Sequence, residues 1–250
     1  MKHPVADAAA PTVDARHRTW RWFFVAMSAA MLTVVLVGFA RTFFLREYFG
    51  TAQLPLGLQT LPVYLYVHGI VLTSWFLLFF IQTIFVASHR TDLHRRLGVA
   101  GAALAAVVVV VSLVVNIRLV PRSPANGTPL AQMPVIFGTS MGFLIAFSLL
   151  VASGIYFRRR PETHKRLKFL ASFSIVGPAV GRLPALMAFP IVLVIVQLSP
   201  LIALILYDVV SDRRVHRATG WGGLLSILVQ VLGAVLAMSG LGRAFIHALG

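Results

Sequence analysis

Seven segments of the chain are almost entirely apolar, and short polar segments separate them. Their lengths are those that an α-helix needs to cross the hydrocarbon core of a bilayer. They exceed the roughly 10 residues of a barrel strand and lack its alternation. The predicted fold is therefore an all-α, polytopic transmembrane helix bundle with about seven spans. The predicted spans cover residues 22–40, 61–87, 97–117, 135–157, 169–187, 189–209 and 221–238.

Composition supports lipid as the main solvent of this chain. Of its 250 residues 58% are hydrophobic and 12% are charged, whereas a soluble domain carries roughly 25% charged residues. Residues 1–19 are polar and rich in Ala and Pro, which predicts a disordered cytoplasmic tail. Residues 20–250 then form a single transmembrane domain. The absence of cysteine excludes disulfides, thiolate metal sites and cysteine nucleophiles.

The basic residues predict the orientation of the chain. Lys and Arg total 22 against 7 acids, a balance that in a soluble protein would suggest nucleic acid. Here the cations fall in short loops, where they set topology and meet anionic lipid headgroups. With a cytoplasmic N-terminus, sixteen of the 22 lie on the inner side. The sequence thus predicts a bacterial cytoplasmic (inner) membrane protein that has its C-terminus outside and binds no nucleic acid.

Two inner loops, at 90–97 and 160–167, share the pattern R-x-[DE]-x-H-[RK]-R-L, and a third at 212–220 keeps its His-Arg pair. Ancestral repetition and convergence on a favourable loop composition both explain this similarity. The loops and nearby helix ends supply a cytoplasmic-face cluster of Asp92, His94, His164, Asp208 and His216.

Three histidines with a carboxylate could bind Zn or Fe in a membrane hydrolase. Neighbouring cations disfavour a bound dication, and neither HxxxH nor HExxH occurs. The sequence therefore favours polar residues at the headgroup level over a metal, with pH sensing as a third reading. Asp208 is expected to pair with a loop arginine or to relay protons.

His68 is the histidine that lies well inside a predicted span, and ionisable groups at that depth suggest function. Arg182 comes to a similar depth from the irregular span at 169–187, where Gly and Pro interrupt the apolar run. With Tyr64, Asn116 and Arg41, these residues could line a polar pocket that opens outward and binds a quinone-like or lipid-like molecule. The alternatives are a b-type haem with Arg182 at a propionate, and a hydrogen-bonded cluster that only holds helices together.

Small residues at helical spacing are predicted to allow close helix contact. They are Gly98, Gly101, Gly138, Gly142 and Gly154. No span contains lysine, which excludes a retinal Schiff base, and no GxSxG, P-loop or GxGxxG motif is present. The sequence favours a non-enzymatic binding protein or an accessory subunit of a membrane complex, alone or as a homo-oligomer.

Four further features form a pattern: residues 39–44, Val67-His68-Gly69 with Trp75 and Gln82, and the loop motifs at 92–98 and 163–167. In this pattern the chain resembles a group of uncharacterised bacterial seven-helix membrane proteins. The resemblance implies the same topology and no assigned activity. Where that group has an acid early in the fourth span, this chain has Thr139-Ser140-Met141, which argues against carboxylate chemistry there.

Overall fold

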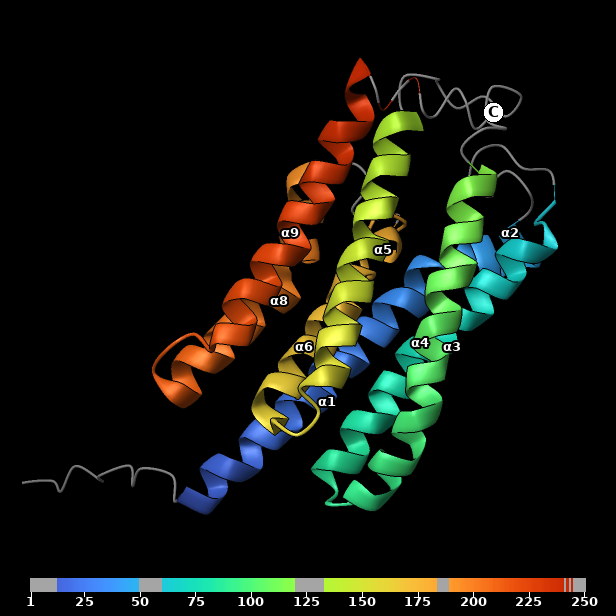
Figure 1. The fold of residues 1–250 in the computed structure, drawn as a ribbon. Helices are drawn as coiled ribbons and strands as arrows, with labels where there is room; N and C mark the ends of the chain where they lie inside the picture. The colour runs from blue at the N-terminus through green and yellow to red at the C-terminus, as the bar shows by residue number, and fades with distance from the viewer. Residues whose placement is uncertain are drawn as a thin grey trace, which may run out of the picture.

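The computed structural model describes residues 13–49, 60–119, 133–183 and 189–240, with residues 242 and 244. Within these residues every regular element is a helix, which confirms the all-α prediction (Figure 1). The long helices are α1 (Val13–Gly38), α3 (Val63–Ala87), α4 (Thr91–Leu119), α5 (Met133–Tyr156), α8 (Pro190–Asp212) and α9 (Arg217–Met238). The short ones are the π-helical η1 (Ala40–Phe44), α2 (Arg46–Phe49), α6 (Pro161–Ser174) and α7 (Gly177–Val180).

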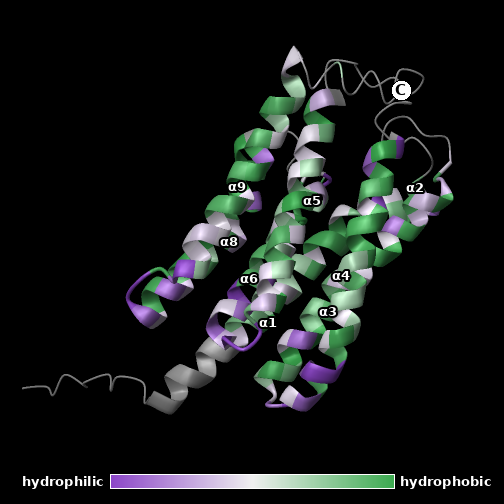
Figure 2. Ribbon diagram, viewed as in Figure 1, coloured by the Kyte–Doolittle hydropathy of each residue, from purple (hydrophilic) through white to green (hydrophobic). Residues whose placement is uncertain are grey.

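Five of the described helices are long and apolar enough to cross a membrane, namely α3, α4, α5, α8 and α9. Large apolar side chains cover their outer surfaces; Val110, Ile195 and Leu228 are each more than half exposed. Figure 2 shows apolar residues along the middle of these helices and polar ones at their lower turns. An apolar outer surface of this kind is favourable in contact with lipid and unfavourable in contact with water.

The turns α3–α4, α5–α6 and α8–α9 lie at the same end of the bundle, at the bottom of Figure 1. These turns, residues 88–90, 157–160 and 213–216, carry exposed arginines, and we call this end the basic end. The shared location agrees with the prediction that the three similar loops lie on one side of the membrane. Helix α1 also starts near this end, at Val13, within the segment predicted as a tail.

The predicted first and fifth spans are not among the five long apolar helices. In α1 the apolar stretch is the shorter segment Trp22–Gly38. The fifth prediction, 169–187, falls on α6 and α7, and its residues 184–188 lie outside the described residues. Helix α6 begins at Pro161, because proline suits a first helical turn, and it ends before the Gly177-Pro178 pair that opens α7.

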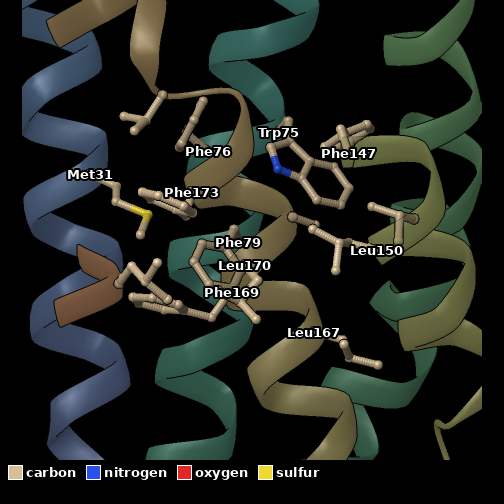
Figure 3. Close-up of a cluster of buried hydrophobic side chains, with 14 of the residues drawn as sticks. Met31, Trp75, Phe76, Phe79, Phe147, Leu150, Leu167, Phe169, Leu170 and Phe173 are labelled. Atoms are coloured by element: carbon tan, nitrogen blue, oxygen red, sulfur yellow. The ribbon is translucent and has the colours of Figure 1, made fainter. Parts of the chain in front are cut away.

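Helix α6 is buried among other helices. It contacts α1, α5, α8 and α9, and all its residues from Arg166 to Ser174 are buried except Lys168, which is partly exposed. A broken helix at this place is stable because neighbouring helices shield its free backbone groups from lipid. Figure 3 shows the aromatic and aliphatic core that surrounds it. The labelled residues are Met31 from α1, Trp75, Phe76 and Phe79 from α3, Phe147 and Leu150 from α5, and Leu167, Phe169, Leu170 and Phe173 from α6 itself.

Candidate functional site

Arg166 of α6 is the centre of a buried ion-pair cluster at the basic end. Its side chain and that of Asp208 on α8 are both fully buried, and the Arg166 Nε and Nη2 atoms lie 2.8 and 2.7 Å from Asp208 Oδ1. Asp212 Oδ2 lies 3.2 Å from Nη2, and Glu162 accepts a hydrogen bond from Nη1. These charge-assisted contacts tie α6 to α8. They confirm the prediction that Asp208 pairs with a loop arginine.

The cluster extends to the start of α9. The second oxygen of Asp208 accepts a hydrogen bond from the backbone N–H of His216 at 3.0 Å. The His216 ring caps α9, because its Nδ1 accepts the Ala218 N–H at 3.1 Å. Burial and the nearby Arg166 lower the pKa of His216, which favours the neutral ring that this cap needs.

Glu162 and Lys165 form the exposed rim of the cluster. Lys165 Nζ lies 2.7 Å from Glu162 Oε2 and 3.3 Å from the Tyr207 hydroxyl. Burial alone would raise the pKa of the Glu162 carboxyl, but hydrogen bonds from Lys165 and Arg166 outweigh it and hold that pKa below 4.5. All three carboxylates of the cluster therefore face cations on one side of α6.

His94 and His164 lie together on the other side of α6. Their ring centroids are 6.1 Å apart, and the rings are nearly perpendicular. His164 Nδ1 donates to the Gly154 carbonyl of α5 at 2.7 Å. Because His164 and Arg166 are two residues apart on a helix, their side chains point about 200° away from each other.

This geometry divides the predicted cytoplasmic-face cluster into two groups. His94 and His164 form one, Asp208 and His216 form the other, and Asp92 is exposed in the first turn of α4. In the described part of the chain, no three His, Asp or Glu side chains gather in a way that could hold a metal ion.

At the opposite end of the bundle, the structure brings His68 and Arg182 together. Arg182 acts electrostatically on His68, and no described residue forms a hydrogen bond with the buried Nδ1 of His68. Arg182 donates to the Pro178 carbonyl at 2.7 Å. Among the described carboxylates none forms an ion pair with Arg182. A buried imidazole nitrogen and a guanidinium without a carboxylate partner in the described residues thus share one site.

Two phenylalanines border this site: Phe39 directly precedes the π-helix η1, and Phe43, within η1, packs against the residue that follows His68. The guanidinium of Arg182 lies 4.8 Å from the centre of the Phe39 ring. Phe43 packs on Gly69, where a Cβ atom would come within 2.5 Å of the ring. Short π-helical segments are frequent at functional sites. We call His68, Arg182, Phe39 and Phe43 the His68–Arg182 site.

The other predicted pocket residues have partners elsewhere. Tyr64 lies 5.8 Å below the guanidinium of Arg118, and the Asn116 side chain donates to the Ser112 carbonyl of its own helix at 2.8 Å. Arg41 is exposed over the Phe49 ring. None of these contacts joins the three side chains to His68 or Arg182 within the described residues.

Sequence reasoning counted Arg166 and Lys168 only as loop charges and missed their burial. A signal for Arg166 was present, because Glu162 precedes it by four residues and Asp208 and Asp212 share the same spacing. The roles of Phe39 and Phe43 had no comparable signal, since their aromatic side chains fit a lipid-facing helix equally well.

Comparison of the chain with protein-family models, curated proteins and solved structures gives no significant match, so the geometry of these sites carries the functional argument.

Proposed function

We propose that the protein is a seven-span, bacterial cytoplasmic-membrane protein that binds a quinone-like or lipid-like molecule at the His68–Arg182 site and catalyses no reaction by itself. The observation that carries the proposal is that, within the described residues, the buried Nδ1 of His68 has no hydrogen-bond partner and the neighbouring Arg182 has no carboxylate partner. Leaving such groups unpaired costs several kcal/mol in an apolar interior (roughly 1–3 per neutral group). An occupant with oxygen acceptors removes that cost.

The chemistry of the site favours a carbonyl or phosphate oxygen attached to an apolar body. The His68 N–H and the free guanidinium N–H groups of Arg182 are donors to such an oxygen. The Phe39 and Phe43 rings supply flat apolar surface for a quinone ring or an acyl chain. Helix α3 then offers a lipid-facing surface along which an isoprenoid or acyl tail can extend. In this role the protein would supply its ligand to a larger membrane complex.

We expect His68→Ala and Arg182→Ala each to lose the co-purifying molecule while the protein still folds. The measurement is mass spectrometry of lipids and quinones extracted from detergent-purified protein, normalised to protein amount. Each substitution removes one charge-assisted or buried hydrogen bond, so occupancy should fall about tenfold or more. An absorption spectrum of the same preparations, oxidised and reduced, tests the haem alternative.

Asn116→Ala is the matched control, because within the described residues its amide donates to the Ser112 carbonyl of its own helix. Occupancy in this variant should equal that of the wild type. If His68→Ala and Arg182→Ala fold and keep the molecule, the proposed site is wrong. If both unfold, with no molecule found in the wild type, the two side chains serve only to hold helices together.

The proposal includes a topology in which the basic end faces the cytoplasm. The chain has no cysteine, so a single introduced cysteine can be labelled without background. Tyr48→Cys, 87% exposed in α2, should react with a membrane-impermeant maleimide in intact cells or spheroplasts. Arg159→Cys, exposed in the α5–α6 turn, should react only after the membrane is permeabilised. The reverse pattern would invert the topology.

A further inference from the structure

The face of α6 that points away from Arg166 carries a second group of nitrogen side chains. Lys168 lies one helical turn after His164, and its ammonium is 5.0 Å from the centre of the Trp75 ring. The stem of Lys168 passes over the α5 backbone at Gly154, where a Cβ atom would lie 3.0 Å from Cδ. His94, from the first turn of α4, adjoins His164. Four helices therefore hold this group in place.

The charge on this face is not neutralised by the protein. Arg166 has three carboxylate partners, whereas no carboxylate in the described residues bonds to Lys168. The groups that act electrostatically on His94 are His164, Arg95 and Lys168, and all of them are basic. All acids near α6 lie on its opposite face. Net positive potential at this depth attracts an anion and repels a metal cation.

Two buried polar atoms at and beside His94 have no hydrogen-bond partner among the described residues. They are Nδ1 of His94 and Oε1 of Gln82, while the Gln82 amide nitrogen donates to the His94 carbonyl at 3.3 Å. Reversing the Gln82 amide does not solve this, because its oxygen would then face the His94 carbonyl oxygen, which is also an acceptor. A ligand that accepts from His94 and Lys168, and that carries a hydroxyl for Gln82, satisfies all of these groups.

We propose that His94, His164, Lys168 and Gln82 bind a phosphate group, that of an anionic phospholipid with a hydroxylated headgroup, at the basic end of the bundle. The level of the site favours a lipid: both histidines lie in the first turns of their helices, next to the exposed arginines of the basic end. Headgroup phosphates lie at that level of a bilayer. This site is separate from the His68–Arg182 site and does not depend on its function.

The test places purified protein in phosphatidylcholine nanodiscs and adds phosphatidylglycerol or, separately, inorganic phosphate. The thermal unfolding midpoint reports stabilisation, and native mass spectrometry counts bound lipid. We expect phosphatidylglycerol to stabilise the wild type and its apparent affinity to fall about tenfold or more in Lys168→Met. Arg159→Gln removes an exposed cation from the same end and should bind as the wild type does.

His94→Phe is a second variant, in case Lys168→Met does not fold; it keeps a ring but removes the nitrogen atoms and should also bind more weakly. Lys168→Arg should retain binding. If Lys168→Met or His94→Phe folds and binds phosphatidylglycerol as tightly as the wild type does, the proposed site is wrong. If inorganic phosphate stabilises the protein as much as phosphatidylglycerol does, the assignment of the site to a lipid is wrong.

The wild-type protein offers an independent measurement. Burial lowers the pKa of Lys168 to about 8, so its charge is present below that pH and is lost above it. The other groups facing the site are His94 and Arg95 from α4 and His164 from α6; Trp75 from α3 and Gly154 from α5 do not titrate. Phosphatidylglycerol binding should therefore weaken as pH rises from 7.5 to about 10. Binding that stays constant over this range would contradict the role of Lys168.

Discussion

Asp208→Ala is expected to lower the free energy of unfolding by about 3–5 kcal/mol, because it leaves the buried Arg166 guanidinium without its fully buried partner. Asp212 and Glu162 remain near that guanidinium, but their side chains are 46% and 58% exposed, so solvent screens their charges. The substitution also frees the His216 backbone N–H that holds the start of α9. Unfolding in detergent with a chemical denaturant measures the loss.

Replacing both partners should cost much less than replacing one. In Arg166→Met with Asp208→Leu no buried charge remains unpaired, and apolar side chains of similar size fill the space. Asp92→Ala is the control, since this acid is exposed in the first turn of α4 and should change stability by less than about 1 kcal/mol. An Asp208→Ala protein as stable as the wild type would show that Arg166 is neutralised by other groups.

Gly138→Ala is expected to separate α5 from α9 and to lower both yield and unfolding temperature. A Cβ atom on Gly138 would lie 2.0 Å from the carbonyl oxygen of Gly233 and 2.6 Å from the Ala237 Cβ. One of these neighbours is backbone and cannot move without displacing its helix. Overpacking of this kind costs about 1–3 kcal/mol, and a larger side chain such as Leu should prevent folding. Thermal unfolding in detergent measures the change.

Gly98→Ala is the matched control within the same membrane domain. The nearest atom to its added methyl group would be the Gln82 amide nitrogen at 3.9 Å, an ordinary contact. Because alanine is the better helix former, this variant should be as stable as the wild type or up to about 1 kcal/mol more stable. If Gly138→Ala and Gly98→Ala behaved alike, close α5–α9 packing would not limit stability.

The two glycines show what spacing can and cannot predict. Gly98 and Gly138 both belong to the small residues that the sequence marks for close helix contact. Gly138 faces the α9 backbone, whereas Gly98 is exposed on α4. Periodicity identifies a face of a helix, but which helix approaches that face depends on how all the others pack.

The candidate site residues also include some whose position the sequence predicted and some whose position it did not. Position along the predicted spans placed His68 and Arg182 at a similar depth, and the structure brings the two residues close enough to interact electrostatically. Position along the spans was not enough to place Tyr64, Asn116 and Arg41, which find local partners. A sequence gives the depth of a residue in a span and leaves the rotation of its helix open.

By itself the sequence determined the helical class, the long apolar helices and the basic turns between them. Observed α3, α5 and α9 begin and end within a few residues of the predicted spans 61–87, 135–157 and 221–238. Lipid imposes this result, because a run of about 20 apolar residues has to satisfy its backbone hydrogen bonds within one helix.

Only the tertiary structure decided that α6 is a buried helix beginning at Pro161, with Arg166 in an ion-pair cluster on one face and Lys168 on the other. In hydropathy these residues look like a charged loop followed by an apolar span. Their burial is stable because acids at 162, 208 and 212, far apart in sequence, neutralise Arg166, and because four helices surround α6. Such pairing depends on distances between helices, which a linear pattern of polar and apolar residues does not contain.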